Sequence, residues 1–325
     1  MRAIEELIGD RVRRAPIAGR TLDIFCDHLA QQLSPEQGAP QTVDDVAAAF
    51  RRFYQLPVPV APHLEPLLET LGIGLTRHGN AADPNACSDF HADAQRWEIF
   101  VRYDLGRQES LALLREVFHI LHRIGTERIP WWEEGMAGRE RPRRAAAAFA
   151  YAVALPPALF LPQALCGGLD LWSLAAHFVT TPGACFHALA RGLRLPFPYF
   201  QALLNFRPEL HGQQELFFAE RGVRAQVWKK CLKRPVGRGI GAWPEMTAAA
   251  QAFPRIGRNT EVDGLLYQAI KTGEPQCALT EEMGGLRLPR PVCLAARPNG
   301  TARSQMFVQI VPAEYADLLR SMERA

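Results

Sequence analysis

Cysteine is scarce in this 325-residue chain and follows no disulfide or metal-binding pattern. The seven cysteines are odd in number, and no two of them are spaced C-x-x-C. The sequence therefore predicts neither a disulfide framework nor a cysteine zinc finger. A reducing cytosol fits this usage best, so we expect a cytoplasmic protein.

Long uninterrupted apolar runs are also missing. The most apolar stretch, residues 145–162, contains three prolines and falls short of the about 20 uninterrupted helical residues that a membrane span needs. Residues 1–16 alternate charged and apolar side chains, unlike a secretory signal. We therefore expect no membrane partner and predict a buried helix over 145–162.

Positive charge is concentrated in one segment of the chain. The whole chain has a formal net charge of only +3, yet residues 221–240 carry seven Lys or Arg and no acid. Cations interleaved with an aromatic side chain can hold phosphates and stack a base. The nucleic-acid-binding candidates are Arg221, Arg224, Trp228, Lys229, Lys230, Lys233, Arg234 and Arg238. The alternative is a solvated strand edge that its cations keep from pairing with other chains.

The first part of the chain has helical periodicity. Apolar spacing predicts helices over 21–33 and 43–54, with Thr42 as the N-cap of the second, and a short helix that ends near Gly72. Residues 73–104 alternate apolar and polar side chains in short runs, as strands of a hairpin do.

Two further helices follow the predicted strands. One spans 110–125, with Ser110 as its expected N-cap and Gly125 as its expected C-terminal stop. The next begins near Pro142, a residue suited to the first helical position.

Helices over 169–178 and 181–192 form a helix-turn-helix candidate, with Thr181 as a cap. The second offers few side chains that read base edges, which favours a packing role. Beyond residue 210, the pattern predicts a small α+β sensor-like module. Its strands are expected at 214–222, 225–232, 292–298 and 305–311, and its helices at 262–273 and 314–325.

The helix over 110–125 contains LLREVFHILH, residues 113–122, which is close to a zinc-binding His-Glu-x-x-His helix. In that pattern, histidines four residues apart bind one zinc ion and the glutamate between them polarises the metal-bound water. Here Glu116 holds the general-base position and His119 the second ligand position. The first ligand position is Arg115.

The order of elements resembles that of the ImmA/IrrE family of zinc metallopeptidases. A second helix, RRAAAAFAYAVALP at 143–156, is similar to the family's ExxANxFAAxLLMP. Phe149, Ala150, Leu155 and Pro156 match that pattern, and the family's third metal ligand falls on Arg143.

The resemblance implies an α+β chain. It comprises an N-terminal helical segment (1–63), a mostly helical zinc-metallopeptidase-like domain with a small sheet (64–165), a helix-turn-helix-like region (166–209) and a GAF-like module (210–325).

The same resemblance implies a degenerate, metal-free site. Guanidinium has no lone pair for a metal and stays protonated, so Arg115 and Arg143 would replace the cation and pair with Glu116. Glu116 would be a vestigial general base, and His119 the one retained ligand position. No cofactor is expected.

The implied function is regulation, in stress response or transcriptional control, rather than catalysis. The partner would be a regulatory protein or DNA, and the C-terminal module would take a small ligand. One alternative is an active metal-dependent endopeptidase that cleaves a repressor and binds zinc through a rearranged set: Glu116, His119, His122 and one of Glu133, Glu134 or Glu140. Another is a DNA-binding transcription factor that relies on residues 221–238.

Overall fold

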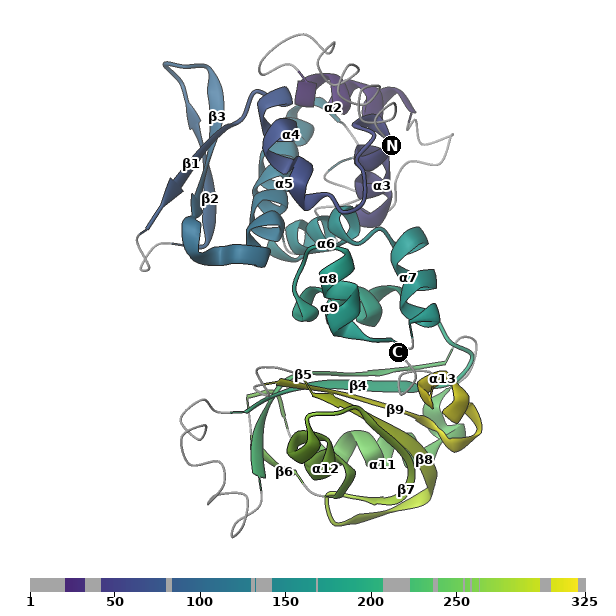
Figure 1. Cartoon of the computed structure of the whole chain (residues 1–325). Helices are drawn as coiled ribbons and strands as arrows, with labels where there is room; N and C mark the ends of the chain where they lie inside the picture. Colours follow the sequence, from purple (N-terminus) through teal and green to yellow (C-terminus); the bar gives the residue numbers. More distant parts are fainter. Residues whose placement is uncertain are drawn as a thin grey trace, which may run out of the picture. The chain divides into compact units, whose positions relative to one another are not determined.

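The computed structural model describes most of the chain in segments: residues 21–32, 42–79, 84–129, 132, 142–167, 169–206, 223–235, 239–253, 255–257, 259–262, 264–298 and 305–320. The fold is α+β, as predicted (Figure 1). The chain divides into two units: residues 1–157 with 175–184, and residues 158–174 with 185–325. The four segments expected from the sequence stay a prediction.

The first unit combines helices with a three-stranded sheet. Its longer helices are α2 (Thr21–Gln32), α3 (Val43–Phe53), α4 (Leu64–Thr70), α5 (Glu109–Arg128) and α6 (Pro142–Ala154), and its 3-10 turns are η2 (Ala61–His63) and η3 (Tyr103–Gln108). Its strands are β1 (Gly74–His78), β2 (Ala86–His91) and β3 (Arg96–Arg102), in the order β1-β3-β2. The β2–β3 hairpin is confirmed, whereas β1 pairs with β3 in parallel.

Helix α5 lies at the centre of this unit, with the sheet on one side and α6 and α2 on others (Figure 1). An aromatic cluster packs α5 against α6. The centroid of the Phe149 ring lies 5.2 Å from that of Phe118 and 5.3 Å from that of Phe50. All three side chains are buried, and each such burial stabilises the fold by about 1.5–3 kcal/mol. The two helices that carry the candidate site are thus held by one core.

One predicted helix end is confirmed and two are wrong. Thr42 caps α3 in a capping box with Asp45. Helix α5 begins at Glu109 without a side-chain cap, and Ser110 is buried inside it. Gly125 does not end the helix, which continues to Arg128. A Cβ atom at Gly125 would lie 3.1 Å from Cδ2 of Trp132. Gly125 therefore serves to let the Trp132 indole pack closely on α5.

The apolar run 145–162 forms two helices, not one. Helix α6 ends at Ala154, and α7 (Pro157–Cys166) begins after two intervening residues. Pro156 has no N–H and its ring clashes with a preceding turn, while Pro157 opens the next helix. In the described part of the chain, no single helix has the length and apolarity to cross a membrane; α6 and α7 meet that test only together, across a 65° bend.

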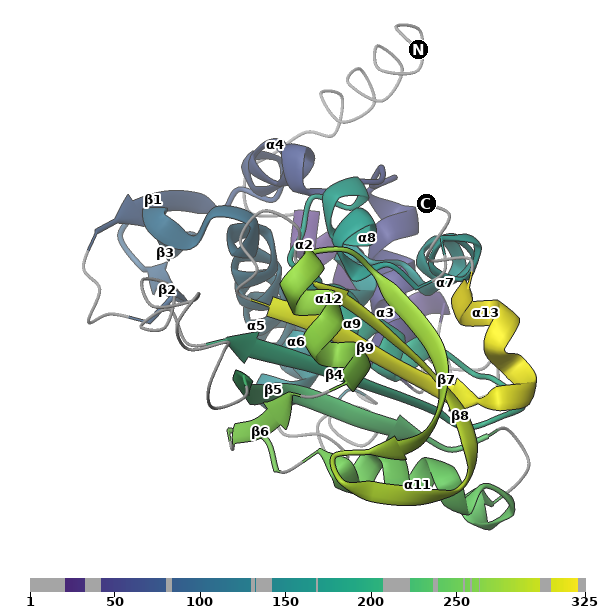
Figure 2. The same cartoon turned by 60° about the horizontal axis from the view of Figure 1, so that its bottom comes forward.

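The second unit is built on a six-stranded antiparallel sheet. Its strands are β4 (Tyr199–Phe206), β5 (Val223–Lys233), β6 (Asn259–Val262), β7 (Gln276–Met283), β8 (Leu286–Pro298) and β9 (Gln305–Pro312). They lie side by side in the order β6-β5-β4-β9-β8-β7 (Figure 2). Its other elements are α11 (Pro244–Ala252), α12 (Gly264–Thr272), α13 (Ala316–Arg320), η6 (Ile240–Ala242) and η7 (Ala313–Tyr315).

The strands at 225–232, 292–298 and 305–311 and the helix at 262–273 are confirmed as β5, β8, β9 and α12. The strand expected at 214–222 lies outside the described residues. The closing helix is confirmed as α13 within the described part. Strand β4 was not predicted, although it is central to the sheet.

Two helices follow α7 along the chain, α8 (Leu171–His177) and α9 (Pro182–Gly192). Thr181 caps α9 by accepting from the Ala184 N–H at 3.2 Å, as predicted. The predicted packing role of α9 is also confirmed, because Phe186 is buried and its ring contacts that of Phe307 on β9.

Candidate functional site

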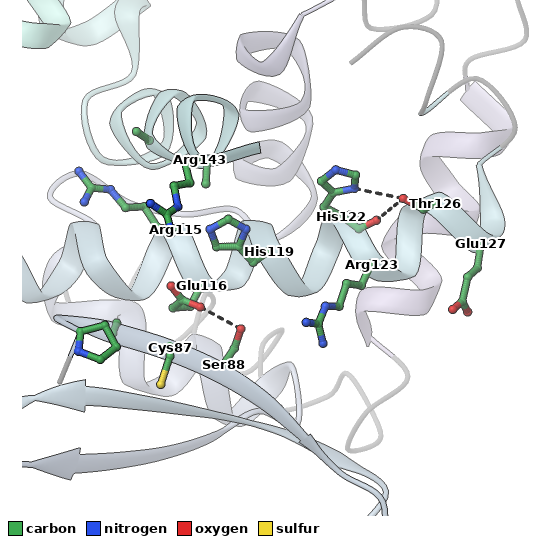
Figure 3. A pocket seen from close by; sticks show the side chains of 14 residues that line it. Cys87, Ser88, Arg115, Glu116, His119, His122, Arg123, Thr126, Glu127 and Arg143 are labelled. Atoms are coloured by element: carbon green, nitrogen blue, oxygen red, sulfur yellow. Dashed lines mark hydrogen bonds between the residues drawn. The ribbon is translucent and has the colours of Figure 1, made fainter. Parts of the chain in front are cut away.

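A cleft of about 1030 Å³ opens in the first unit between α5, α6 and β2 (Figure 3). The α5 residues in its lining recur at helical spacing, so one face of the helix forms its floor. Among the residues that the structure describes, the polar and charged side chains that line it are Cys87, Ser88, Arg115, Glu116, His119, His122, Arg123, Thr126, Glu127 and Arg143. The structure thus brings together the four positions that the sequence assigned to the degenerate site.

Arg115 and Glu116 diverge instead of pairing. The Ser88 hydroxyl on β2 donates to Glu116 Oε2 at 2.9 Å. Arg115 turns toward α6, where its Nη2 lies 3.4 Å from the Tyr151 hydroxyl and its guanidinium 5.9 Å from the ring centroid. Consecutive helical residues project about 100° apart, so the expected ion pair between Arg115 and Glu116 is wrong.

His119 is half-buried and lines the same cleft about one helical turn after Glu116 (Figure 3). Burial lowers the pKa of its imidazole below the usual value; Glu116 raises it, and His122, Arg123 and Arg143 lower it further. The imidazole is therefore favoured in its neutral form, with one nitrogen as donor and the other as acceptor.

His122 is committed to a structural contact. Its Nδ1 lies 3.0 Å from Nε1 of the buried Trp132, and an indole N–H can only donate. Nδ1 must therefore accept, which places the imidazole proton on Nε2. In this tautomer neither nitrogen of His122 offers a lone pair to a metal, which weakens the rearranged zinc site.

The donor set does not fit a catalytic zinc ion, which needs three protein ligands and a water. Glu116 and His119 are the possible donors at the assigned positions, and Arg115 and Arg143 have no lone pair to give. Within the described segments, no three His, Cys, Asp or Glu side chains gather as a metal site. Glu133, Glu134 and Glu140 lie outside those segments.

Sequence reasoning missed several side chains of this cleft. Arg123 follows Arg115 by eight residues, so helical spacing alone would have placed both on one face. Ser88 and Tyr151 come from other elements, and no local pattern indicates that they contact Glu116 and Arg115.

The basic segment of the second unit is not a single cationic surface in its described part. Arg221 and Arg238 lie outside the described residues, and of Arg224 the structure gives only its backbone pairing with Glu261. Trp228 lies at a bulge in β5 and is 38% exposed, with the Lys229 ammonium 4.9 Å from its ring centroid.

The three lysines of β5 contact different neighbours. Lys230 Nζ donates to the Phe253 carbonyl at the end of α11 at 2.5 Å. Lys233 Nζ donates to the Ala190 carbonyl near the end of α9, also at 2.5 Å. Lys229 Nζ lies 2.6 Å from His187 Nε2 on α9. These ammonium groups stabilise helix ends and contacts on both faces of the sheet, while Arg234 is exposed.

Comparison with known proteins leaves the family open. No protein-family model matches the chain, and no curated protein matches it. Among solved structures, it is similar to a Mycobacterium tuberculosis transcriptional regulator, with 13% identity and a TM-score of 0.45 over 92% of this chain and 95% of that chain. This likeness is too weak to assign a family or a function.

Proposed function

We propose that this chain is a regulatory protein that binds a ligand or partner in the cleft rather than hydrolysing a peptide. Its first unit would be a degenerate ImmA/IrrE-like metallopeptidase domain. The observation that carries this proposal is the position of Arg115 and Arg143, which line the same cleft as Glu116 and His119. Two guanidinium groups would thus occupy the ligand positions of the metal.

The state of the remaining side chains supports the same proposal. A catalytic zinc ion needs three protein ligands, and of the three assigned ligand positions His119 alone keeps a side chain with a lone pair for the metal. Stress response or transcriptional control is the setting that the resemblance implies. The partner would be a regulatory protein or DNA, with a small ligand in the α+β sheet module of the second unit.

Restoring the two ligand positions tests the assignment. The double variant Arg115→His/Arg143→Glu should bind one zinc ion per chain in a titration followed by equilibrium dialysis. The matched control is Arg115→His/Arg144→Glu, which moves the new carboxylate to an exposed neighbour on α6. If the folded Arg115→His/Arg143→Glu variant binds no more zinc than this control, the assignment of the ligand positions is wrong. Chelator-sensitive cleavage of a test protein by the wild type would also overturn the proposal.

A further inference from the structure

Cationic side chains dominate the cleft between α5, α6 and β2. Arg115 and Arg123 enter its lining from α5, and Arg143 enters from α6. Glu116 and Glu127 are the carboxylates among its lining residues. Among the described residues of the lining, arginine exceeds carboxylate by one charge.

Arg115 has hydrogen-bond donors that the described residues do not fill. Its Nε is buried and has no hydrogen-bond partner. Its hydrogen bond from Nη2 to the Tyr151 hydroxyl is long at 3.4 Å, and hydrogen bonds weaken toward that length. A buried donor without an acceptor is unfavourable, so an acceptor in the cleft would stabilise this side chain.

Arg143 reaches the same space from the other helix. Figure 3 shows its side chain extending from α6 toward Arg115 and His119 on α5. In the described part of the chain, it makes neither an ion pair nor a hydrogen bond. Two guanidinium groups that face one space repel each other, and an anion between them would turn that repulsion into attraction.

The other charges of the cleft are engaged or distant. Glu116 accepts from Ser88 on the β2 side, and the Arg123 guanidinium lies 5.4 Å from the Trp97 ring centroid. Glu127 is twelve residues from Arg115, about 18 Å along the helix axis. Among the described residues of the cleft, Arg115 and Arg143 are therefore the pair whose charge and donors remain available.

We propose that Arg115 and Arg143 together bind an oxyanion, the carboxylate or phosphate group of a small molecule, in this cleft. The inference rests on the proposed function, because it places the anion where a catalytic metal would otherwise lie. The planar fork of guanidinium binds both carboxylate and phosphate through two parallel N–H bonds. The cleft is at the upper end of the size range of small-molecule sites, about 300–1,000 Å³.

Calorimetric titration of the full chain at low ionic strength tests this inference. The probes are inorganic phosphate, pyrophosphate, acetate and succinate, so the two phosphate arms and the two carboxylate arms identify the kind of oxyanion. We expect saturable binding of at least one probe in the millimolar range or tighter. Arg115→Gln and Arg143→Gln should each weaken it about tenfold or more, as expected for a lost hydrogen bond to a charged group.

The matched control is Arg144→Gln, which removes the same charge from the exposed neighbour of Arg143. It should leave the affinity within about twofold, since Arg144 is not among the described residues that line the cleft and an exposed charge acts on the cleft only weakly through water. Arg115→Lys keeps the positive charge but lacks the planar guanidinium and its paired N–H donors. It is the variant to use if Arg115→Gln does not fold, and it too should weaken binding. Absence of saturable binding by all four probes would overturn the inference, as would equal losses in Arg143→Gln and Arg144→Gln. A chain that holds no zinc yet binds no probe would refute this inference alone, whereas stoichiometric zinc would refute the proposed function.

Discussion

Loss of the Arg297 side chain should strongly destabilise the second unit. Arg297 on β8 forms an ion pair with Asp170, and the two side chains are only 9% and 6% exposed. Asp170 also accepts from the Trp172 N–H at 2.9 Å and from the Ser173 hydroxyl, so it caps α8 as well. In Arg297→Met the buried carboxylate would keep these two neutral donors and lose its counter-charge.

The magnitude follows from this geometry. Removing one member of a buried ion pair costs about 3–5 kcal/mol, whereas replacing both by neutral groups is often close to neutral. Asn caps a helix about as well as Asp, so Asp170→Asn keeps the cap. The double variant Arg297→Met/Asp170→Asn should therefore be more stable than Arg297→Met.

Urea unfolding read by hydrogen-exchange mass spectrometry is the suitable assay, because peptides from β8 and β9 report on the second unit alone. The two single variants should each lose several kcal/mol, and the double variant should recover at least about 2 kcal/mol relative to their sum. A loss below about 1 kcal/mol in Arg297→Met, or strict additivity in the double variant, would refute the reasoning.

Three further outcomes are expected. Replacing a helical glycine by alanine usually stabilises a helix by about 1 kcal/mol. In Gly125→Ala, however, the added Cβ would lie 3.1 Å from the Trp132 ring, so the melting temperature should fall. A rise would contradict this close packing. NMR titration should give His119 a pKa below its usual value of about 6.5, because burial favours the neutral form. Its contribution to stability is then complete above about pH 6.5 and is lost as the pH falls through the lower folded pKa; a His119 pKa at or above the usual value would contradict this. Finally, Sγ of Cys277 and Sγ of Cys293 lie 3.5 Å apart, so treatment with diamide should join them with the loss of two hydrogens. Peptide mapping that finds both thiols free, while the exposed Cys87 and Cys166 have reacted, would contradict that juxtaposition.

Local sequence patterns predicted much of the helical structure, because helix periodicity and capping depend on near neighbours. Thr42 and its capping box illustrate this. Gly125 shows the limit: its role depends on Trp132, seven residues away, and not on the helix end. Strand β4, which follows the prolines at 196 and 198, was missed. Tyr199 and Gln201 lie on one face of this strand and Phe200 and Ala202 on the other, and all four side chains are buried.

The candidate site was predicted in its residues but not in its contacts. The spacing within α5 and the resemblance of 143–156 indicated that Arg115, Glu116, His119 and Arg143 belong together, and all four line the cleft. The partner of Glu116 is Ser88, 28 residues away on another element. Such pairs depend on tertiary packing, which no local pattern records. For the same reason the lysines of β5, which looked like a free basic surface, have partners on α9 and α11.

The most direct test of the central claim is the metal content of the wild-type chain. Protein purified without chelator, then dialysed against zinc and against zinc-free buffer, should contain far less than one zinc ion per chain by elemental mass spectrometry. This result is expected because Arg115 and Arg143, which line the cleft, stand at two of the three proposed ligand positions and cannot bind zinc. One tightly held zinc ion per chain, retained by the wild type and lost on substitution of His119, would contradict it.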